Sequence, residues 1–334
     1  MRKIKIAQIG TNKLSHGGPV FDTLSKNSDV FEIVGYVMPE NENEKFASAM
    51  EMGSFKKYRE LTLEEVLNNP EIEAVTIETE EIYLTKYAQM AADAKKHIHM
   101  EKPGGLVLAE FEKLIKTVKM NKTIFHVGYM YRYNPYISKL IERVKSGEFG
   151  EIISVEAQMS GYHSDEIRKW LKNFDGGIMF FLGCHLIDLI LQIQGIPERV
   201  ISLNKSTGLN NIDSTDFGMA VLEYKNGVSF AKTTDIERGG FLRRQLVVTG
   251  TKGMVEVKPL EENVEYPRTI TCYKETKDTD WNAKAEKQKS EMFGRYDAML
   301  RSFAEMVRGE KENLWSYDYE LELYKMVLEA CGKK

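Results

Sequence analysis

Strand-like and helix-like stretches alternate along residues 1–130, and this alternation constrains the fold more than any other feature of the sequence. Short apolar runs typical of buried strands recur between longer runs with apolar residues at helical spacing. The expected strands are 3–9, 31–37, 74–79, 98–101 and 123–128, and the expected helices are 19–26, 44–52, one that opens at a Thr62-x-x-Glu65 capping box, 83–96 and 109–120. Because parallel neighbouring strands need crossover connections, the pattern predicts an α/β domain with a doubly wound parallel sheet.

The pattern changes after residue 128, where strands begin to follow one another directly. The expected elements are helices 136–145 and 177–194, strands 152–159, 199–203, 217–224, 228–234, 245–249, 253–258 and 269–273, and closing helices 292–308 and 319–330. Asn226-Gly227 is a strong hairpin signal, and Thr251-Lys252 marks a second turn. The sequence therefore predicts a dinucleotide-type domain over 1–128 and an α+β domain with an open, mostly antiparallel sheet over 129–334. The last helix can return to the first domain.

Charge and cysteine usage exclude several classes of protein. Lys and Arg number 46 and Asp and Glu number 50, so the net charge of −4 disfavours general binding to nucleic acid or anionic membranes. The three cysteines are widely spaced, and no cluster has the spacing of metal ligands, so neither a disulfide framework nor a metal site is expected. The N-terminus lacks signal-peptide character, and the most apolar stretch, 178–193, contains His185 and Asp188. We expect a buried helix there, and a cytoplasmic protein.

Gly10 directly follows the first expected strand, where a dinucleotide-binding βαβ unit places its glycines. Such a turn needs one glycine for the bend, one for close approach to the pyrophosphate and one for helix packing. Gly10 fits the first role, Asn12 stands where the second glycine is expected, and Gly17 and Gly18 come late. A plain strand-to-helix loop is the alternative. Backbone N–H groups at the start of the next helix can still hold a phosphate.

Four segments, taken together, resemble the glucose–fructose oxidoreductase / inositol dehydrogenase / MocA family of NAD(P)-dependent oxidoreductases. They are Glu101-Lys102-Pro103 and the segments 128–135, 147–152 and 176–188, in this order along the chain. The resemblance implies a Rossmann domain, followed by a substrate domain whose open sheet often serves oligomerisation. It also implies hydride transfer to or from a hydroxyl-bearing carbon of a sugar, sugar derivative or polyol. We therefore expect a small carbohydrate-type substrate and a homodimer or homotetramer.

The resemblance also implies roles for individual residues. Lys102 matches a lysine that contacts substrate and nicotinamide and is often followed by a cis proline bond; a solvated surface lysine is the alternative. His185 matches a histidine that acts as general acid and base; a core histidine is the alternative. Asp188 either orients His185 or forms an internal hydrogen bond. We expect the side chains of Lys102 and His185 to share one substrate hydroxyl.

The remaining site residues are expected at two places. The residues expected to bind the dinucleotide are Gly10, Asn12, His16, Met38, Glu40, Thr79, Glu101 and Lys102. The residues expected to contact the substrate are Tyr129, Arg132, Tyr162 and Asp188, and His163 could line the same cleft. Packing, with Arg132 paired to an acid, is the alternative for the aromatic cluster around Arg132.

The chain departs from the family's pattern at three points. Phe181 stands four residues before His185, where the family often has an aspartate, so a Lys–Asp–His arrangement is missing. Met38-Pro39-Glu40 ends the second strand without an acid at the strand end or an arginine, which favours NAD weakly over NADP. Glu80 and Glu81 follow the third strand, where two carboxylates would repel a bound pyrophosphate unless they face a ribose hydroxyl or solvent. The dinucleotide would then bind weakly, bind in an altered geometry, or stay tightly bound to the protein and be recycled there.

These departures keep two other functions open beside an NAD(P)-dependent dehydrogenase. The first is an NAD-assisted glycoside hydrolase or lyase of the same fold, which oxidises its sugar transiently and reduces it again. The second is a protein that senses a nucleotide or a sugar without turnover.

Overall fold

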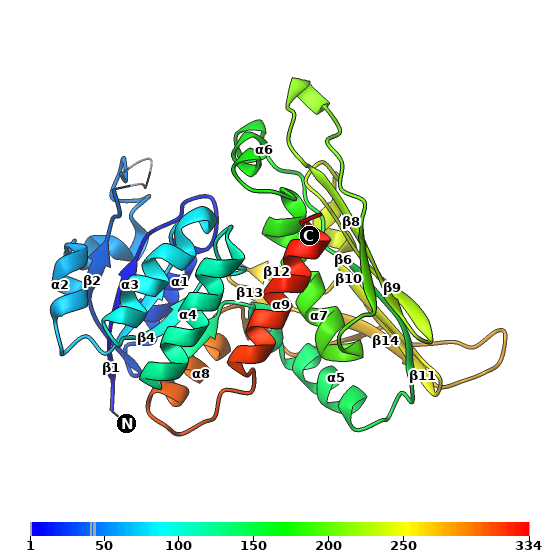
Figure 1. Cartoon of the computed structure of the whole chain (residues 1–334). Helices are drawn as coiled ribbons and strands as arrows, with labels where there is room; N and C mark the ends of the chain where they lie inside the picture. Colours follow the sequence, from blue (N-terminus) through cyan, green and yellow to red (C-terminus); the bar gives the residue numbers. More distant parts are fainter. Residues whose placement is uncertain (1, 41, 43–44, 334) are drawn as a thin grey trace. The chain divides into compact units, whose positions relative to one another are not determined.

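The structure is a computed structural model that describes residues 2–40, 42 and 45–333. The chain divides into two units (Figure 1). The first unit comprises Met1–Tyr129 and Tyr296–Tyr324, and the second comprises Met130–Arg295 and Lys325–Lys334. Each unit has its own sheet and core.

The first unit is built on a five-stranded parallel sheet in the order β2-β1-β3-β4-β5. The strands are β1 (Ile4–Ile9), β2 (Phe31–Val37), β3 (Ala74–Ile77), β4 (His97–Met100) and β5 (Phe125–Val127). The helices are α1 (Gly17–Lys26), α2 (Leu63–Asn68), α3 (Leu84–Asp93), α4 (Leu108–Asn121) and α8 (Asp297–Val307). The strand order reverses between β1 and β3, which is where open α/β sheets bind ligands at the carboxyl ends of their strands. The predicted doubly wound α/β fold is confirmed.

One predicted helix of the first unit is wrong. The described part of 44–52, residues 45–52, contains turns and bends but no helix, and a short 3₁₀ helix follows at Gly53–Lys57. The carboxylate of Glu51 accepts hydrogen bonds from the backbone N–H groups of Ala47 and Ser48. Such local side-chain bonds compete with the helical backbone ladder. The Thr62 capping box of α2 is present as expected.

The second unit contains an eight-stranded sheet in the order β15-β14-β11-β10-β6-β9-β8-β7. Its strands are β6 (Ile152–Gln158), β7 (Arg199–Ser202), β8 (Phe217–Tyr224), β9 (Gly227–Thr234), β10 (Gln245–Gly250), β11 (Gly253–Val257), β14 (Cys272–Thr276) and β15 (Gln288–Lys289). Only β6 and β9 run parallel among the pairs that the structure describes in this sheet. The mostly antiparallel sheet and both hairpins are confirmed.

The predicted strand 269–273 is instead divided between two sheets. Its first half belongs to β13 (Arg268–Ile270), which pairs with β12 (Glu262–Glu265) and β16 (Phe293–Gly294) in a three-stranded sheet. Its second half begins β14 in the large sheet. The break falls at Thr271, whose backbone N–H donates to Ser290 Oγ. The predicted closing helix 292–308 accordingly starts later, at Asp297.

The helices of the second unit lie on one face of its large sheet (Figure 1). They are α5 (Pro135–Lys145), α6 (Asp165–Trp170), α7 (Cys184–Gln194) and the last residues of α9 (Tyr317–Ala330). The expected continuous helix 177–194 begins instead with a π-helical turn at Met179–Gly183. Residues 184–193 of α7 are all buried, as expected for the apolar stretch that carries His185. No helix in the described ranges is both long and apolar enough to cross a membrane.

Candidate functional site

The turn after β1 has room only for glycine at two positions. Gly10 has φ +91°, and a Cβ there would lie 2.6 Å from the backbone nitrogen of Thr79. A Cβ on Gly17 would lie 1.9 Å from the carbonyl oxygen of Thr11, whereas a Cβ on Gly18 would meet no atom within 4 Å. The turn therefore packs closely against the residues after β3 and leaves open space at the start of α1. This is the arrangement that close approach of a pyrophosphate requires.

Two side chains hold this turn in place. The Asn12 amide donates to the Thr79 carbonyl at 3.2 Å and to Glu81 Oε2 at 3.1 Å, which joins the turn to the end of β3. Burial raises the pKa of Glu42 to about 7, although hydrogen bonds from the backbone N–H groups of Thr11 and Asn12 oppose the shift.

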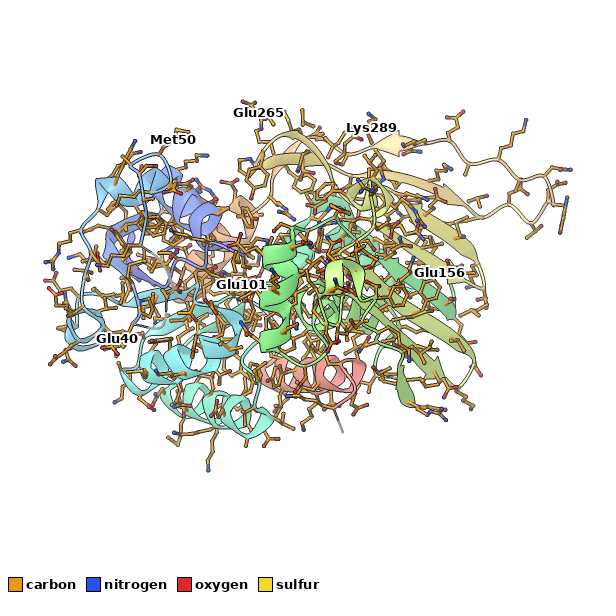
Figure 2. The ribbon with its side chains drawn as sticks, turned by 90° about the horizontal axis from the view of Figure 1, so that it is seen from above. Glu40, Met50, Glu101, Glu156, Glu265 and Lys289 are labelled. Carbon is orange, nitrogen blue, oxygen red and sulfur yellow. The ribbon has the colours of Figure 1, made fainter. Side chains whose placement is uncertain are left out.

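Two residues expected near the adenosine ribose lie at the end of β2. The side chain of Met38 packs against the cluster of Phe21, Tyr36 and Phe55. Glu40 is exposed and lies at the edge of the first unit (Figure 2). Contact between these residues and a ribose stays a prediction.

Lys102 follows β4 and is fully buried, so the solvated surface lysine is not what the structure shows. Its Nζ lies 3.3 Å from Glu101 Oε1, and the Lys102–Pro103 peptide bond is cis. Glu101 Oε1 is also 3.3 Å from His16 Nδ1. Burial would raise the pKa of Glu101, but the charges of Lys102 and His16 outweigh it and lower the pKa to about 2. A Cβ on Gly128 would lie 3.1 Å from Glu101 Oε2, so a glycine there leaves room for the carboxylate.

Two further carboxyl groups lie in the same region, and sequence reasoning missed their burial. Glu78 and Glu81 are both fully buried after β3. Burial raises the pKa of Glu81 to about 7, with Lys102 lowering it and Glu101 adding to it. Burial and the charges of Glu101 and Glu81 raise the pKa of Glu78 well above its usual range. Within the described ranges, neither oxygen of Glu78 and only one oxygen of Glu81 has a hydrogen-bond partner.

These neighbours place Lys102 among three acids whose pKa values are shifted in different directions. Near neutral pH, Glu101 is ionised and Glu81 is poised between its two forms, while the pKa of Glu78 lies well above its usual range. Glu81 is fully buried, so its carboxyl group does not face solvent, which was one of the two placements expected to avoid repulsion of a pyrophosphate. The sequence signal that could have revealed these buried acids is their position directly after an apolar strand.

Two buried histidines extend this group into the sheet. His99 Nδ1 lies 2.7 Å from His126 Nδ1, so one proton lies between the two rings. His99 Nε2 lies 3.9 Å from Glu78 Oε1. Burial lowers the pKa of His99 to about 4, and the charge of Glu101 opposes the shift. His99 is therefore neutral at neutral pH.

In the second unit, His185 lies on α7 and is buried. The ring of Tyr131 meets it edge-on, with 5.2 Å between the ring centroids. The Tyr131 hydroxyl donates to Glu261, which also accepts hydrogen bonds from Arg244 at 2.6 Å and from Arg295 at 2.8 Å. A charged network thus fixes the aromatic ring that packs against His185.

Arg132 and Asp188 form a buried, two-pronged ion pair in the second unit. Arg132 Nε lies 3.0 Å from Asp188 Oδ2, and Arg132 Nη2 lies 2.9 Å from Asp188 Oδ1. Gln192 Nε2 donates to the same carboxylate at 2.9 Å. Arg132 is therefore paired with an acid, which was the alternative to direct sugar binding, and Asp188 makes internal hydrogen bonds.

The other predicted substrate residues differ in exposure. Tyr129 is buried and ends the main segment of the first unit. Tyr162 is 51% exposed, with the Arg238 guanidinium 4.8 Å from its ring centroid. That Lys102 and His185 share a substrate hydroxyl stays a prediction, because they belong to different units. Among the residues that the structure describes, no group of three or more His, Cys, Asp or Glu side chains is placed to hold a metal ion.

Curated relatives match part of this chain. A scyllo-inositol 2-dehydrogenase (NADP(+)) of Bacillus subtilis is 25% identical over 165 residues, which are 48% of this chain and 46% of the relative. A 2,7-anhydro-N-acetylneuraminate hydratase of Escherichia coli is 24% identical over 208 residues, which are 59% of this chain and 54% of the relative. The chain spans about half the length of these curated relatives.

Solved structures share the fold over nearly the whole chain. An aldose-aldose oxidoreductase from Caulobacter crescentus, complexed with glycerol, superposes with a TM-score of 0.80 at 16% identity and covers 98% of this chain and 96% of its own. A 3-ketoreductase from Actinomadura kijaniata, in complex with NADP and TDP-benzene, gives 0.77 at 14% identity with the same coverage.

Family models match both parts of the chain. Residues 4–129 match the oxidoreductase family with an NAD-binding Rossmann fold, and residues 137–256 match the GFO/IDH/MocA C-terminal domain. With the parallel sheet, the glycine turn and the buried Lys102 described above, these matches identify the chain as an oxidoreductase of the Gfo/Idh/MocA family.

Proposed function

We propose that this protein transfers a hydride between a nicotinamide cofactor and a hydroxyl-bearing carbon of a sugar, sugar derivative or polyol. The observation that carries the proposal is the buried Lys102 ammonium, held by the ionised Glu101 beside the poised carboxyl group of Glu81. The chain is similar to a protein named scyllo-inositol 2-dehydrogenase and to a solved aldose-aldose oxidoreductase. Both names agree with a sugar or polyol substrate.

The chemistry follows from the charges around Lys102. The nicotinamide, when bound, supplies or accepts the hydride. The Lys102 ammonium donates a hydrogen bond to the reacting oxygen and stabilises the negative charge that develops on it, and this effect is strong because the group is shielded from water. During oxidation the single hydroxyl proton passes to His185, while Glu81, with a pKa of about 7, exchanges protons with Lys102 and so maintains its ammonium form; reduction reverses the transfer to His185.

His185 is the second proton carrier in this proposal. Imidazole is the side chain that most often exchanges protons near neutral pH. The edge-on contact with Tyr131 holds its ring in one orientation. Position 181 supplies no carboxylate to this path, because Phe181 stands there and is buried against Trp170, with 5.2 Å between the ring centroids.

One observation favours a second candidate, a lyase or hydrolase that oxidises its sugar only transiently. Phe181 removes the aspartate expected beside His185, and one relative is named a hydratase. Such an enzyme would cleave or hydrate its substrate without net formation of NADH. Product analysis combined with nicotinamide absorbance separates the two candidates.

Replacing either proton carrier tests the proposed function. Lys102→Ala and His185→Ala should each lower the turnover of an oxidised polyol or sugar by about 10²- to 10⁴-fold, the usual effect of losing a positioned acid or base. Nicotinamide absorbance follows the reaction with inositols and aldoses, and the matched control is Lys113→Ala at an exposed lysine on α4. Thermal melting and dinucleotide titration verify folding and cofactor binding. Near-full turnover in either variant would remove that residue from the mechanism.

Glu81→Gln tests whether Glu81 is poised near neutral pH. The pKa of Glu81 is raised from 4.5 to about 7, so its contribution to stability is present below pH 4.5 and is lost as the pH rises through 7. Glutamine can still accept from Asn12 but never ionises. The variant should therefore match the wild type at low pH and exceed its unfolding free energy by about 3 kcal/mol above pH 8.

Denaturant unfolding at a series of pH values measures this difference. Glu64→Gln, at an exposed glutamate on α2, is the matched control and should show no such pH-dependent gain. A difference between Glu81→Gln and the wild type that stays constant with pH would show that Glu81 ionises normally.

Cofactor choice is the third test, and we propose that NAD is preferred. The end of β2 offers no arginine for a 2′-phosphate, and the carboxylate of Glu40 would repel one. Titration of the dinucleotide-free protein with NADH and NADPH, followed by fluorescence, should show tighter binding of NADH. Glu40→Arg should shift the preference toward NADPH, whereas Glu64→Arg should not. Equal or tighter binding of NADPH to the wild type would reverse the assignment.

We also propose that the uncovered face of the eight-stranded sheet joins two or four copies of this chain. Side chains on β8 alternate: Gly218, Ala220 and Leu222 are buried, and a Cβ on Gly218 would contact Met179 of the π-helical turn. The residues between them point to the other face. The partly exposed apolar residues there are Phe217, Met219, Val221, Phe230 and Val247. Glu156 lies between Phe230 and Val247 on this face, and Lys232 lies opposite Met219, so the apolar part is centred on β8 and Phe230. Exposed apolar clusters are typical of interfaces.

Light scattering tests this assembly. The wild type should have the mass of a dimer or tetramer, and Val221→Lys should dissociate it, because Val221 lies directly across from Phe230 in the middle of that face. Lys225→Glu, in the hairpin turn, should leave the mass unchanged. A wild type that is monomeric at every concentration would contradict the proposal.

A further inference from the structure

We propose that Trp281 of one copy of this chain docks into a cavity between α5 and β14 of a second copy. Trp281 lies on the connection between the antiparallel strands β14 and β15, residues 277–287, which we call the arm. Hairpin strands are usually joined by about 2–5 residues, so the arm is long for its position. It projects beyond the ends of β11 and β14 (Figure 1). This contact between copies is independent of the proposed function.

Local hydrogen bonds give the tip of the arm a defined turn. The Asp278 carboxylate accepts from the Asp280 backbone N–H at 3.0 Å, and the Asp280 carboxylate accepts from the Asn282 backbone N–H at 2.7 Å. Within the described ranges, residues 278–286 make hydrogen bonds only inside the arm or with the end of β14. The turn thus presents Trp281, which is 98% exposed, without packing it against the rest of the chain.

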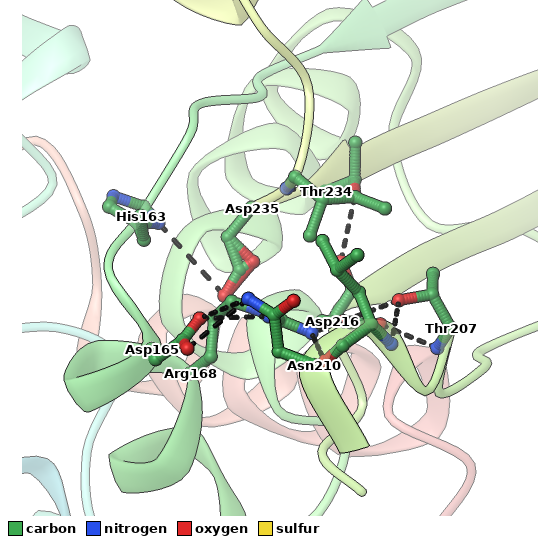
Figure 3. Close-up of polar contacts among 10 residues, drawn as sticks. His163, Asp165, Arg168, Thr207, Asn210, Asp216, Thr234 and Asp235 are labelled. Atoms are coloured by element: carbon green, nitrogen blue, oxygen red, sulfur yellow. Dashed lines mark hydrogen bonds and ion pairs between the residues drawn. The ribbon is translucent and has the colours of Figure 1, made fainter. Parts of the chain in front are cut away.

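Another long loop of the second unit, between β7 and β8, is tied to its surroundings. There the Asn210 amide donates to the Asp165 carboxylate of α6 at 3.0 Å (Figure 3). The described residues of the arm make an ion pair with the body of the unit only at the base, where Lys277 Nζ lies 2.8 Å from Glu148 Oε1. A long loop can therefore be secured by its own chain, and the exposure of Trp281 is specific to the arm.

The proposed receiving site is a cavity of about 620 Å³ between α5 and the strands β14 and β15. The rings of Tyr136 and Tyr273 stack there with 3.8 Å between their centroids, and Met292 and Phe293 add apolar lining. Pockets of about 300–1,000 Å³ hold drug-sized ligands, so an indole ring has room in this one. Aromatic pairs also stabilise a contact beyond the area that they bury. The cavity therefore suits the side chain that the arm exposes.

One ion-pair network holds both the cavity wall and the base of the arm. Arg143 lies 2.7 Å from Glu275 Oε2 and 2.8 Å from Glu148 Oε2, and Glu275 also accepts a hydrogen bond from the Tyr136 hydroxyl. Lys277, the first residue of the arm, pairs with the same Glu148. A site that is already ordered costs less to fill. Because each copy carries an arm and a cavity, two copies related by a two-fold axis can fill each other's cavities.

The charges of the arm and the cavity are complementary. Lys139 and Lys289 line the cavity, and neither has an ion-pair partner in the part of the chain that the structure describes. Asp278 and Asp280 precede Trp281, and each carboxylate uses one oxygen for its local hydrogen bond. Docking would bring these two acids toward the two lysines. Complementary charges of this kind select the partner and speed association.

The acids at the cavity do not oppose this arrangement. Glu275 is already paired with Arg143. Glu291 is exposed and opposite in sign to Lys284 of the arm. A second copy of this chain therefore offers each sign of charge at the cavity its opposite.

This contact is separate from the uncovered sheet face. The cavity lies beside α5, on the side of the sheet that helices cover, whereas Val221 and Phe230 point to the other side. One chain can therefore use both surfaces at once. Two different two-fold contacts generate a tetramer.

Trp281→Ala in the full-length chain tests the role of the arm. Light scattering over a concentration series should show that the variant associates at least about 30-fold more weakly than the wild type, as for a tryptophan at the centre of an interface. Its mass should halve, from tetramer to dimer or from dimer to monomer. Trp281→Phe should retain most of the association, and the matched control is Met50→Ala, at an 89% exposed residue of the first unit. An unchanged mass in Trp281→Ala would overturn the proposal.

Mixing two variants tests which surface receives the arm. A variant with Lys139→Glu and Lys289→Glu keeps its own arm but repels an incoming one, so it should dissociate as Trp281→Ala does. When the two variants are mixed, the intact arm of one can dock into the intact cavity of the other. Native mass spectrometry should therefore detect mixed pairs that neither variant forms alone. Their absence would overturn the assignment of the cavity.

Iodide quenching of fluorescence tests whether the Trp281 ring is covered. The emission of Trp281 is the difference between the wild type and Trp281→Phe. It should be shielded from iodide in the assembled protein and become quenchable when dilution dissociates the copies. Full quenching at every concentration would contradict docking. Shielding in a monomeric protein would show instead that the arm folds onto its own cavity, which also overturns the proposal.

Discussion

The buried ion pair between Lys102 and Glu101 is the interaction on which the rest of the first unit's site depends. A lysine with no exposed surface needs an ionised partner, and Lys102 and His16 together keep Glu101 ionised. Burial raises the pKa values of Glu78 and Glu81, and the negative charge of Glu101 adds to both shifts. The surrounding backbone fits this group, because Gly128 leaves space for the Glu101 carboxylate. The charge pattern around Lys102 is thus a consequence of packing.

Much of the fold could be predicted because its signals are local. The strand expected at 31–37 is β2, the Asn226-Gly227 signal marks a real hairpin, and the Thr62 capping box is present. The misses arise where side chains compete with the backbone ladder. Glu51 bonds to the N–H groups that a helix over 45–52 would need, and Ser290 takes the N–H of Thr271 and divides one expected strand between two sheets. Neither competition is visible in hydrophobic periodicity.

The site was predictable in part. Lys102 and His185 carry recognisable sequence contexts, and the structure shows both side chains buried. The acids that determine how Lys102 behaves were not predictable, because the pKa of a carboxyl group depends on what buries it and on which donors are already committed. Glu81 and Asp235 illustrate the same rule in the two units: each acid follows a strand and keeps at least one oxygen without a donor in the described structure. Acids placed directly after apolar strands are therefore the sequence signal to inspect first.

The charge pattern around Lys102 is tested most directly by carbon-13 NMR of the glutamate carboxyl carbons, assigned with Glu81→Gln and Glu101→Gln variants. The Glu101 resonance should stay at its ionised position down to the lowest pH at which the protein is folded, while the Glu81 resonance should move with a midpoint near pH 7. Titration of both groups near 4.5, the ordinary value for glutamate, would contradict it.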